Sequence, residues 1–125
     1  MGIVLYGAST MISVTLDRDG PTALHLQVAA EIRRAIAEGE AAPGDRLPPA
    51  VDFATILGVN KNTVIRALHI LRDEGILDFT RGRGVRVVGT AEKSAVLARV
   101  GEMLEYAGRF GYQPGDVISM IQTRA

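Results

Sequence analysis

Cysteine is absent from the sequence, and only two of its 125 residues are histidines. The absence of cysteine excludes a disulfide framework and thiolate chemistry. His25 and His69 lie far apart along the chain and lack the spacing of metal ligands, so we expect no metal and no other cofactor. The sequence also lacks paired catalytic carboxylates and a nucleophile beside a base, and it therefore predicts a protein that is not an enzyme.

Long hydrophobic runs are missing as well. The short apolar stretch within Met1 to Thr10 has no basic run before it, is too short to cross a bilayer and is not typical of a signal peptide. A cleaner alternating pattern begins at Met11, so we set the first ten residues outside the functional interpretation, as an upstream start or a non-native remnant. We expect a cytoplasmic protein that does not bind membranes. An apolar fraction of 47% is ample for one folded domain with a short appendage.

No charge of either sign dominates, because 14 basic and 14 acidic residues give a net charge of zero. The charges are nevertheless unevenly spread. Residues 1–59 carry four basic and seven acidic side chains, residues 60–90 carry six and three, and residues 91–125 carry four of each. The positive excess in the middle segment fits a surface that faces phosphates, and overall neutrality does not exclude binding to nucleic acid.

Apolar periodicity and turn residues predict the elements of the first half. Residues 12–16 alternate and are β-branched, which predicts a short strand followed by a cluster of turn residues. Apolar residues at helical spacing predict a helix over about residues 22–38, with Gly39 as its stop. Residues 42–49 are dense in turn formers and precede a short helix over about residues 50–57.

The stretch Leu57-Gly-Val-Asn-Lys-Asn-Thr63 is the most informative. Gly58 can adopt the positive φ of a sharp turn, and Asn60 can cap a helix that begins at Lys61. Helix, tight turn and helix follow one another, as in a helix-turn-helix. The second helix has an apolar side with Val64, Ala67, Leu68 and Leu71, and an outward side with Asn62, Ile65, Arg66 and His69.

Two β-rich segments follow the helix pair, residues 76–80 and residues 85–88. They bracket Arg81-Gly-Arg-Gly84, so they predict a hairpin with a basic, glycine-rich tip, which is the wing of a winged helix. The tip joins two strands and does not open a helix, which argues against a nucleotide cradle.

We expect the second helix of the pair to enter the major groove of DNA with its N-terminal residues first. Lysine can donate to guanine or phosphate, asparagine can pair with adenine, and threonine can contact phosphate or a thymine methyl group. The arginines of the hairpin tip can approach the minor groove or phosphates. The predicted DNA-binding residues are Arg46, Asn60, Lys61, Asn62, Thr63, Ile65, Arg66, Arg81, Gly82, Arg83 and Gly84.

Simpler interpretations stay open for several of these residues. The polar residues at the helix start can be ordinary solvated residues, and the hairpin tip can be no more than a good turn. Ile65 can pack on thymine methyl groups or be partly buried against the neighbouring helix. Arg46 can reach a phosphate or pair with Asp45 or Asp52. His69 can be solvated or contact a phosphate.

A new helical pattern runs from Ala91 to about Phe110, with apolar residues alternately four and three apart, as in a packing seam. Gly111 breaks this pattern, and Pro114 can start a final helix. Two such helices cannot bury all their apolar residues against each other, so we expect a partner subunit to cover them. The alternative is packing wholly on the winged domain of the same chain. The predicted dimerisation residues are Val96, Val100, Met103, Leu104, Ala107, Phe110, Val117, Ile118 and Ile121.

These motifs together resemble the GntR family of bacterial regulators over about residues 21–88. The matching motifs are Pro43-Gly-Asp-Arg-Leu-Pro48, Leu57-Gly-Val59, Asn60-Lys-Asn-Thr-Val64, Arg66-Ala-Leu68, Glu74-Gly-Ile-Leu77 and Arg81-Gly-Arg-Gly84. They occur in the order and at the spacing typical of the family, which makes the match more specific than any one motif. The resemblance implies a winged helix-turn-helix that binds DNA.

The sequence departs from the family pattern at four positions. The family has an arginine where this chain has Lys61, and many members have another where it has Ile65. The serine and arginine that usually follow the Leu-Pro turn are replaced by Pro49 and Val51, so a DNA contact from the first helix of the pair is missing. Only about 36 residues follow the wing, which resembles the short YtrA subfamily. That likeness implies dimerisation by two C-terminal helices and control of operons for ABC-type transporters.

The sequence therefore predicts an α+β protein, with a winged helix-turn-helix DNA-binding domain over residues 11–89 and a short two-helix dimerisation tail over residues 90–125. We expect a sequence-specific transcription regulator, by default a repressor, that binds an inverted-repeat operator in double-stranded DNA as a homodimer. An alternative of a different class keeps the fold but makes it a protein-interaction module, and Val51 in place of arginine favours it. The sequence identifies no ligand pocket and no small-molecule effector.

Overall fold

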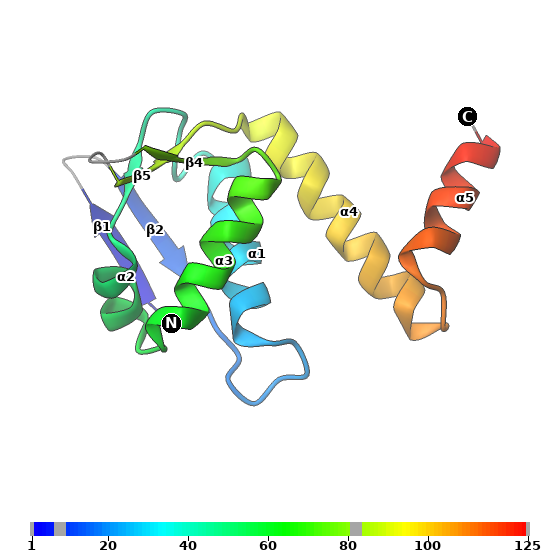
Figure 1. Ribbon diagram of the computed structural model, residues 1–125, viewed down its shortest axis with the longest axis horizontal. Coiled ribbons are helices and arrows are strands. Elements are labelled where there is room, and N and C mark those ends of the chain that lie inside the picture. The colour runs from blue at the N-terminus through cyan, green and yellow to red at the C-terminus, as the bar shows by residue number, and fades with distance from the viewer. Residues whose placement is uncertain (1, 7–9, 81–83, 125) are drawn as a thin grey trace.

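The computed structural model describes residues 2–6, 10–80 and 84–124, with side chains from residue 13 to 79 and from 84 to 124 (Figure 1). Helices and short antiparallel strands share one core, which confirms the α+β class. In chain order the described elements are β1 (Gly2–Tyr6), β2 (Thr10–Val14), α1 (Leu24–Ala37), β3 (Arg46–Leu47), α2 (Ala50–Leu57), α3 (Lys61–Asp73), β4 (Leu77–Thr80), β5 (Gly84–Val87), α4 (Ala91–Arg109) and α5 (Pro114–Arg124).

The core is built around α1. Val28, Ile32 and Ile36 are spaced one helical turn apart, and all three are buried together with Ala29 and Ala35. Burying each large aliphatic side chain contributes roughly 1.5–3 kcal/mol to the hydrophobic free energy of folding. One side of α1 packs against α3 and another against α4, so this helix connects the helix-turn-helix to the C-terminal helices.

A three-stranded antiparallel sheet with the strand order β3-β5-β4 covers one end of the helices. Leu77 lies opposite Val87 in the register, and both are buried, so this face of the sheet belongs to the core. The strand β3 corrects the sequence analysis, which expected only turns over residues 42–49. A strand of two residues is too short to show alternation, and it forms because its backbone pairs with β5.

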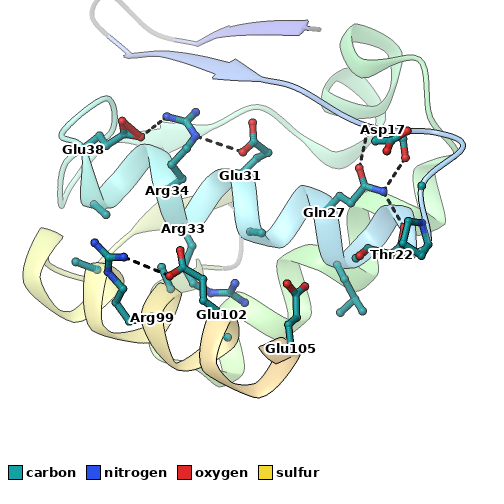
Figure 2. A pocket seen from close by; sticks show the side chains of 18 residues that line it. Asp17, Thr22, Gln27, Glu31, Arg33, Arg34, Glu38, Arg99, Glu102 and Glu105 are labelled. Carbon is teal, nitrogen blue, oxygen red and sulfur yellow. Dashed lines mark hydrogen bonds and ion pairs between the residues drawn. The ribbon is translucent and has the colours of Figure 1, made fainter. Parts of the chain in front are cut away.

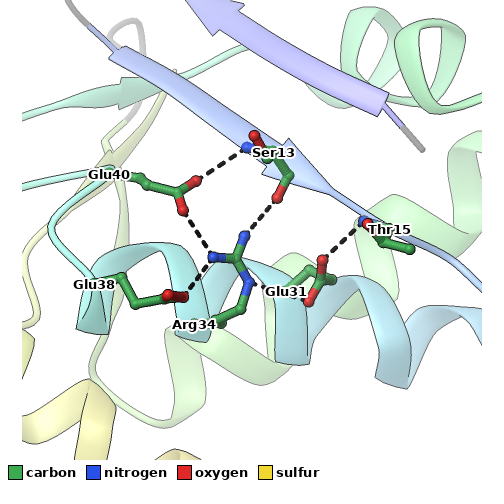
Figure 3. A network of polar contacts seen from close by, with 6 residues as sticks. All are labelled: Ser13, Thr15, Glu31, Arg34, Glu38 and Glu40. Atoms are coloured by element: carbon green, nitrogen blue, oxygen red, sulfur yellow. Dashed lines mark hydrogen bonds and ion pairs between the residues drawn. The ribbon is translucent and has the colours of Figure 1, made fainter.

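The N-terminal strands also differ from the expectation. β2 ends at Val14 rather than at residue 16, and β1, within the ten residues set outside the interpretation, pairs with it. The described pairing ends where Gly2 of β1 lies opposite Val14. A polar network holds the other edge of β2 against α1 (Figure 3). The backbone N–H groups of Ser13 and Thr15 donate to the carboxylates of Glu40 (3.0 Å) and Glu31 (2.8 Å).

Arg34 lies at the centre of this network. Its guanidinium donates to the carboxylates of Glu31, Glu38 and Glu40 and to the carbonyl of Ser13. The hydrogen bond from Arg34 is the main cause that lowers the pKa of Glu40 below its usual value, and the N–H of Ser13 adds to it. The network therefore fixes β2 to α1 through charged groups.

The first turns of α4 supply its buried contacts with the core. Ser94 is fully buried, and Leu97 packs against the core from the next turn. The rest of α4 projects away from the sheet and α3, and α5 folds back beside its far end (Figure 1). None of the helices in the described part of the chain is long and apolar enough to cross a membrane.

An open groove of about 670 Å³ runs between α1 and α4 (Figure 2). Small residues such as Ala30, Ala98 and Gly101 line it, together with charged residues of both helices. Several of these charges pair along their own helix, as Arg99 does with Glu102. Sequence analysis identified no pocket, because this groove arises only from the way in which α4 packs on α1.

Candidate nucleic-acid interface

The turn between α2 and α3 has the geometry that its sequence predicts. Gly58 ends α2 in the left-handed conformation, with a φ of 68°, which a residue with a Cβ adopts only under strain. The side chain of Asn60 accepts a hydrogen bond of 2.7 Å from the N–H of Asn62 and so caps α3. Both capping predictions are confirmed, and α3 begins at Lys61 as expected.

The two sides of α3 also match the prediction. Val64, Ala67, Leu68 and Leu71 are buried. Among the predicted DNA-binding residues, Lys61, Asn62 and Arg66 are exposed, while Thr63 and Ile65 are half-buried. The N-terminal half of α3 therefore presents polar and cationic side chains to solvent, and the half-burial of Ile65 fits the interpretation that it packs partly against its own domain.

Arg18 holds the turn from outside, and the sequence analysis missed it. This residue lies in the loop between β2 and α1, and its guanidinium donates to the carbonyls of Leu57 (2.7 Å) and Gly58 (3.1 Å). The last carbonyls of a helix lack N–H partners within the helix, and a cation is favourable there. No local motif marks Arg18, because its partners lie 39 and 40 residues further along the chain.

The C-terminal end of α3 is fixed by a second arginine. Arg33 on α1 makes two hydrogen bonds of 2.8 Å to the carboxylate of Glu74, the residue that follows the helix. Such a paired contact fixes direction as well as distance. Arg18 thus holds the turn that precedes α3, and Arg33 holds the residue that follows it.

Aromatic contacts join α3 to the sheet. The ring of His69 meets Phe79 of β4 edge-on at 5.4 Å, and the guanidinium of Arg72 lies 5.1 Å from the centre of the same ring. His69 is exposed to solvent beyond this contact. Burial and, secondarily, the charge of Arg66 lower the pKa of His25, which lies in the first turn of α1.

The hairpin of β4 and β5 has the form of the expected wing. Thr80 pairs with Gly84, whose φ is 75°. The predicted tip residues Arg81, Gly82 and Arg83 lie outside the described residues. The sequence analysis placed Arg46 in a turn, and the structure corrects this. Arg46 lies in β3, where it is exposed and directly opposite Arg86 of β5.

The ion pair of Arg46 with Asp45 or Asp52, one of the two interpretations of the sequence, is absent from the described chain. Within the described chain, neither Asp45 nor Asp52 forms an ion pair with it, and Asp45 instead accepts a hydrogen bond of 2.8 Å from the N–H of Ala42. Among the described residues no cluster of three or more metal-ligating side chains occurs.

The C-terminal helices carry an exposed apolar stripe. Phe110 is 65% exposed and Val96 63%, and Tyr106 meets Phe110 edge-on at 5.3 Å although both rings face solvent. The alternative interpretation, in which these helices pack wholly on the winged domain of the same chain, is therefore wrong. Of the predicted dimerisation residues, Val96, Val100, Met103, Phe110, Ile118 and Ile121 are exposed, and Leu104 and Ala107 are half-buried.

The structure corrects the prediction for one of these dimerisation residues, Val117. It is only 5% exposed in the single chain, so it cannot offer its side chain to a partner. It lies at the start of α5, which packs against α4. Its burial therefore comes from packing within the single chain.

Comparison with known proteins places these features in a family. The family of "Bacterial regulatory proteins, gntR family" matches residues 24–87, just over half of the chain. The HTH-type transcriptional repressor YtrA of Bacillus subtilis is 32% identical over 83 residues, which cover 66% of this chain and 64% of the repressor. The HTH-type pyridoxine biosynthesis transcriptional regulator PdxR of Corynebacterium glutamicum is 36% identical over 76 residues, 61% of this chain but 17% of PdxR. The chain thus spans less than two thirds of the length of these curated relatives.

Solved structures show the same domain. YtrA from Sulfolobus acidocaldarius, a GntR-family transcription factor, is 32% identical with a TM-score of 0.58, and the match covers 74% of this chain and 97% of that one. The DNA-binding domain of AraR in complex with operator ORX1 is 26% identical with a TM-score of 0.52, covering 62% and 96%. The chain therefore belongs to the GntR family of bacterial regulatory proteins, and its folded core is the winged helix-turn-helix DNA-binding domain of a transcription regulator.

Proposed function

We propose that this chain acts in the cytoplasm as a homodimeric repressor that binds an inverted-repeat operator in double-stranded DNA. The observation that carries the proposal is the exposed start of α3. Lys61 and Asn62 stand free of the core at the end of a helix that Arg18 and Arg33 hold in place. A helix end of this kind can enter the major groove, where side chains read base edges.

Each exposed residue of α3 has a role in this proposal. Asn62 pairs with adenine, Lys61 donates to guanine or to a phosphate, and Thr63 contacts a phosphate or a thymine methyl group. Arg66 lies one turn after Asn62 and is exposed on the same side. The wing, with Arg81 and Arg83 at its tip, contacts the flanking minor groove or phosphates.

The exposed stripe on α4 and α5 supports dimerisation through a second copy of the chain. Monomeric proteins rarely leave large contiguous apolar patches in water. Here Val96, Val100, Met103 and Phe110 are exposed at helical spacing along α4 and its C-cap, and Ile118 and Ile121 are exposed on α5. A twofold contact between two such stripes covers both at once. In this proposal residues 11–89 bind DNA and residues 90–125 dimerise.

Repression is the default action of a dimer that occupies DNA at a promoter. YtrA of Bacillus subtilis is a repressor by name, and the mannosyl-D-glycerate transport/metabolism system repressor MngR of Escherichia coli is 41% identical over 68 residues, 54% of this chain and 28% of MngR. By analogy with such relatives, we propose a transporter operon as the regulated target. The proposed function includes no enzymatic step and no cofactor.

The test is the selection of bound duplexes from a random DNA library at near-physiological salt, followed by sequencing. We expect an inverted repeat whose half-sites lie about one helical turn apart. Asn62→Ala should change the preferred bases within each half-site, whereas Asp73→Ala, at the opposite end of the same helix, should not. Recovery of DNA without an enriched sequence would contradict operator recognition. No recovery of DNA would favour a protein-interaction module.

A further inference from the structure

The sheet register brings together charges that are distant in sequence. In the described sheet, Arg86 of β5 lies directly opposite Arg46 of β3 on one side and Asp78 of β4 on the other. Residues directly opposite each other in antiparallel strands lie on the same face, with their Cβ atoms about 4.5–5.5 Å apart. Leu77 and Val87 occupy the core face, so this row lies on the outer face of the wing sheet.

The row has more positive charge than its own residues balance. Two arginines are direct neighbours in the register, with one aspartate on the far side of Arg86, and an arginine cannot lose its proton to relieve repulsion. Among the described residues, neither Arg46 nor Arg86 forms an ion pair. The Nε atom of Arg86 is buried and lacks a hydrogen-bond acceptor within the described chain. A buried donor without an acceptor is a costly arrangement unless a ligand supplies the acceptor.

We propose that Arg46 and Arg86 together bind one phosphate group. Guanidinium groups present planar pairs of donors that match phosphate oxygens, and an anion between the two arginines removes their repulsion. Arg86 lies two residues after Gly84, which pairs with Thr80 in the hairpin of β4 and β5, and Arg46 lies beside it on the neighbouring edge strand β3. The phosphate is therefore that of the DNA backbone beside the wing, or that of a free small molecule. The assignment of this phosphate to DNA rests on the proposed function, whereas the binding of a free phosphate does not.

The first arm of the test measures binding to the selected operator duplex by fluorescence anisotropy over a series of salt concentrations. The slope of log affinity against log salt is negative, and the loss of one phosphate contact makes it less steep by about 0.9. We expect Arg46→Gln, Arg86→Gln and the double variant each to lose about one such contact, because both arginines hold the same phosphate. Their preferred bases should stay unchanged. Arg99→Gln on α4 is the control and should keep the wild-type slope.

The second arm uses inorganic phosphate alone, at constant ionic strength with chloride as the reference. If the site binds a free phosphate, phosphate should raise the Tm of the wild type but not that of the double variant. If its phosphate belongs to DNA, the salt slope changes and this Tm difference is absent. An unchanged salt slope together with no phosphate-dependent Tm difference overturns the proposal.

The two measurements distinguish a failure of the phosphate site from a failure of the proposed function. If the wild type binds no duplex, the proposed function fails, and the phosphate titration alone then decides whether the site exists. Variants that do not fold are replaced by Arg46→Lys and Arg86→Lys, which keep the charge but remove the planar fork. We expect these variants to bind the operator more weakly than the wild type, and equal affinity would contradict a shared, paired contact.

Discussion

Arg18 donates a hydrogen bond of 2.7 Å to the carbonyl of Leu57, the last residue of α2 and 39 positions further along the chain. A second bond, to Gly58, places the guanidinium across the turn that leads into α3. A loop outside the helix-turn-helix thus holds the turn in place. The consequence is that a change in this loop can alter DNA recognition without touching a residue that contacts DNA.

Replacement of Arg18 by alanine tests this relationship. We expect the free energy of unfolding to fall by about 1 kcal/mol, because charged hydrogen bonds to the end of α2 are lost. We also expect the ratio of operator to non-operator affinity to fall, since α3 is less firmly placed. Urea unfolding and competition binding measure the two effects. Arg18→Lys should recover part of both, and a variant with wild-type values in both measurements would refute the role of Arg18.

The ion pair between Arg33 and Glu74 gives a second prediction. Its atoms are mostly shielded from solvent, with side-chain exposures of 13% and 25%. Glu74→Gln or Arg33→Gln should each cost about 1–2 kcal/mol of stability, between the values for exposed and buried pairs. The charge-reversed double variant Arg33→Glu with Glu74→Arg should be more stable than either single reversal. Additive losses in that double variant, measured by urea unfolding, would argue against a direct pair.

Glu40 should make stability depend on pH. Its pKa is lowered in the folded protein, mainly by the hydrogen bond from Arg34, whereas the unfolded chain has the ordinary value of about 4.5. The carboxylate therefore stabilises the fold fully above that value, and this contribution is lost as the pH falls through the lower folded pKa. Urea unfolding at several pH values should show a smaller acid-induced loss for Glu40→Gln than for the wild type. Parallel curves would contradict this assignment.

Val51 occupies the exposed first turn of α2, at the position where the family usually has an arginine, and its side chain is 55% exposed. Val51→Arg should therefore add a phosphate contact without disturbing the core. We expect tighter operator binding and a salt slope steeper by about one unit. Val51→Gln, which adds polarity without charge, is the matched control. An unchanged slope would show that this turn does not face DNA.

Phe110 should be central to the proposed dimer, because it is the most exposed of the predicted dimerisation residues and forms an aromatic pair with Tyr106. Phe110→Glu should shift the chain to a monomer in analytical ultracentrifugation and weaken operator binding, since two half-sites are no longer held together. Arg109→Glu, at the neighbouring position but outside the stripe, should remain dimeric. A dimeric Phe110→Glu variant would place the interface elsewhere.

The parts of this fold that sequence analysis predicted are those with local causes. Gly58 and Asn60 act on their own turn, and the two sides of α3 follow from helical spacing alone. Pairing between distant segments is what local patterns do not contain. β3 exists only because β5 lies beside it, and Arg86 became a candidate only when the register placed it opposite Arg46.

The same limit of local patterns applies to the C-terminal helices. Their apolar spacing correctly predicted a stripe, but spacing did not show that Val117 faces α4 rather than a partner. That distinction depends on the angle between α4 and α5. The angle is set by the short connection after Arg109, whose Gly111 has a φ of 84°.

Because α4 is one continuous helix, its length matters for the separation of the two DNA-binding domains in the proposed dimer. One uninterrupted helix of 19 residues joins the anchor at Ser94 to the stripe that ends at Phe110. Inserting one residue between them would advance the stripe by about 1.5 Å and rotate it by about 100° around the helix axis, whereas seven residues would restore its phase about 10.5 Å further out. In the proposed dimer, the length of α4 would therefore set the distance between the two recognition helices. An insertion that keeps the phase of the stripe would change this distance without turning the stripe away from its partner.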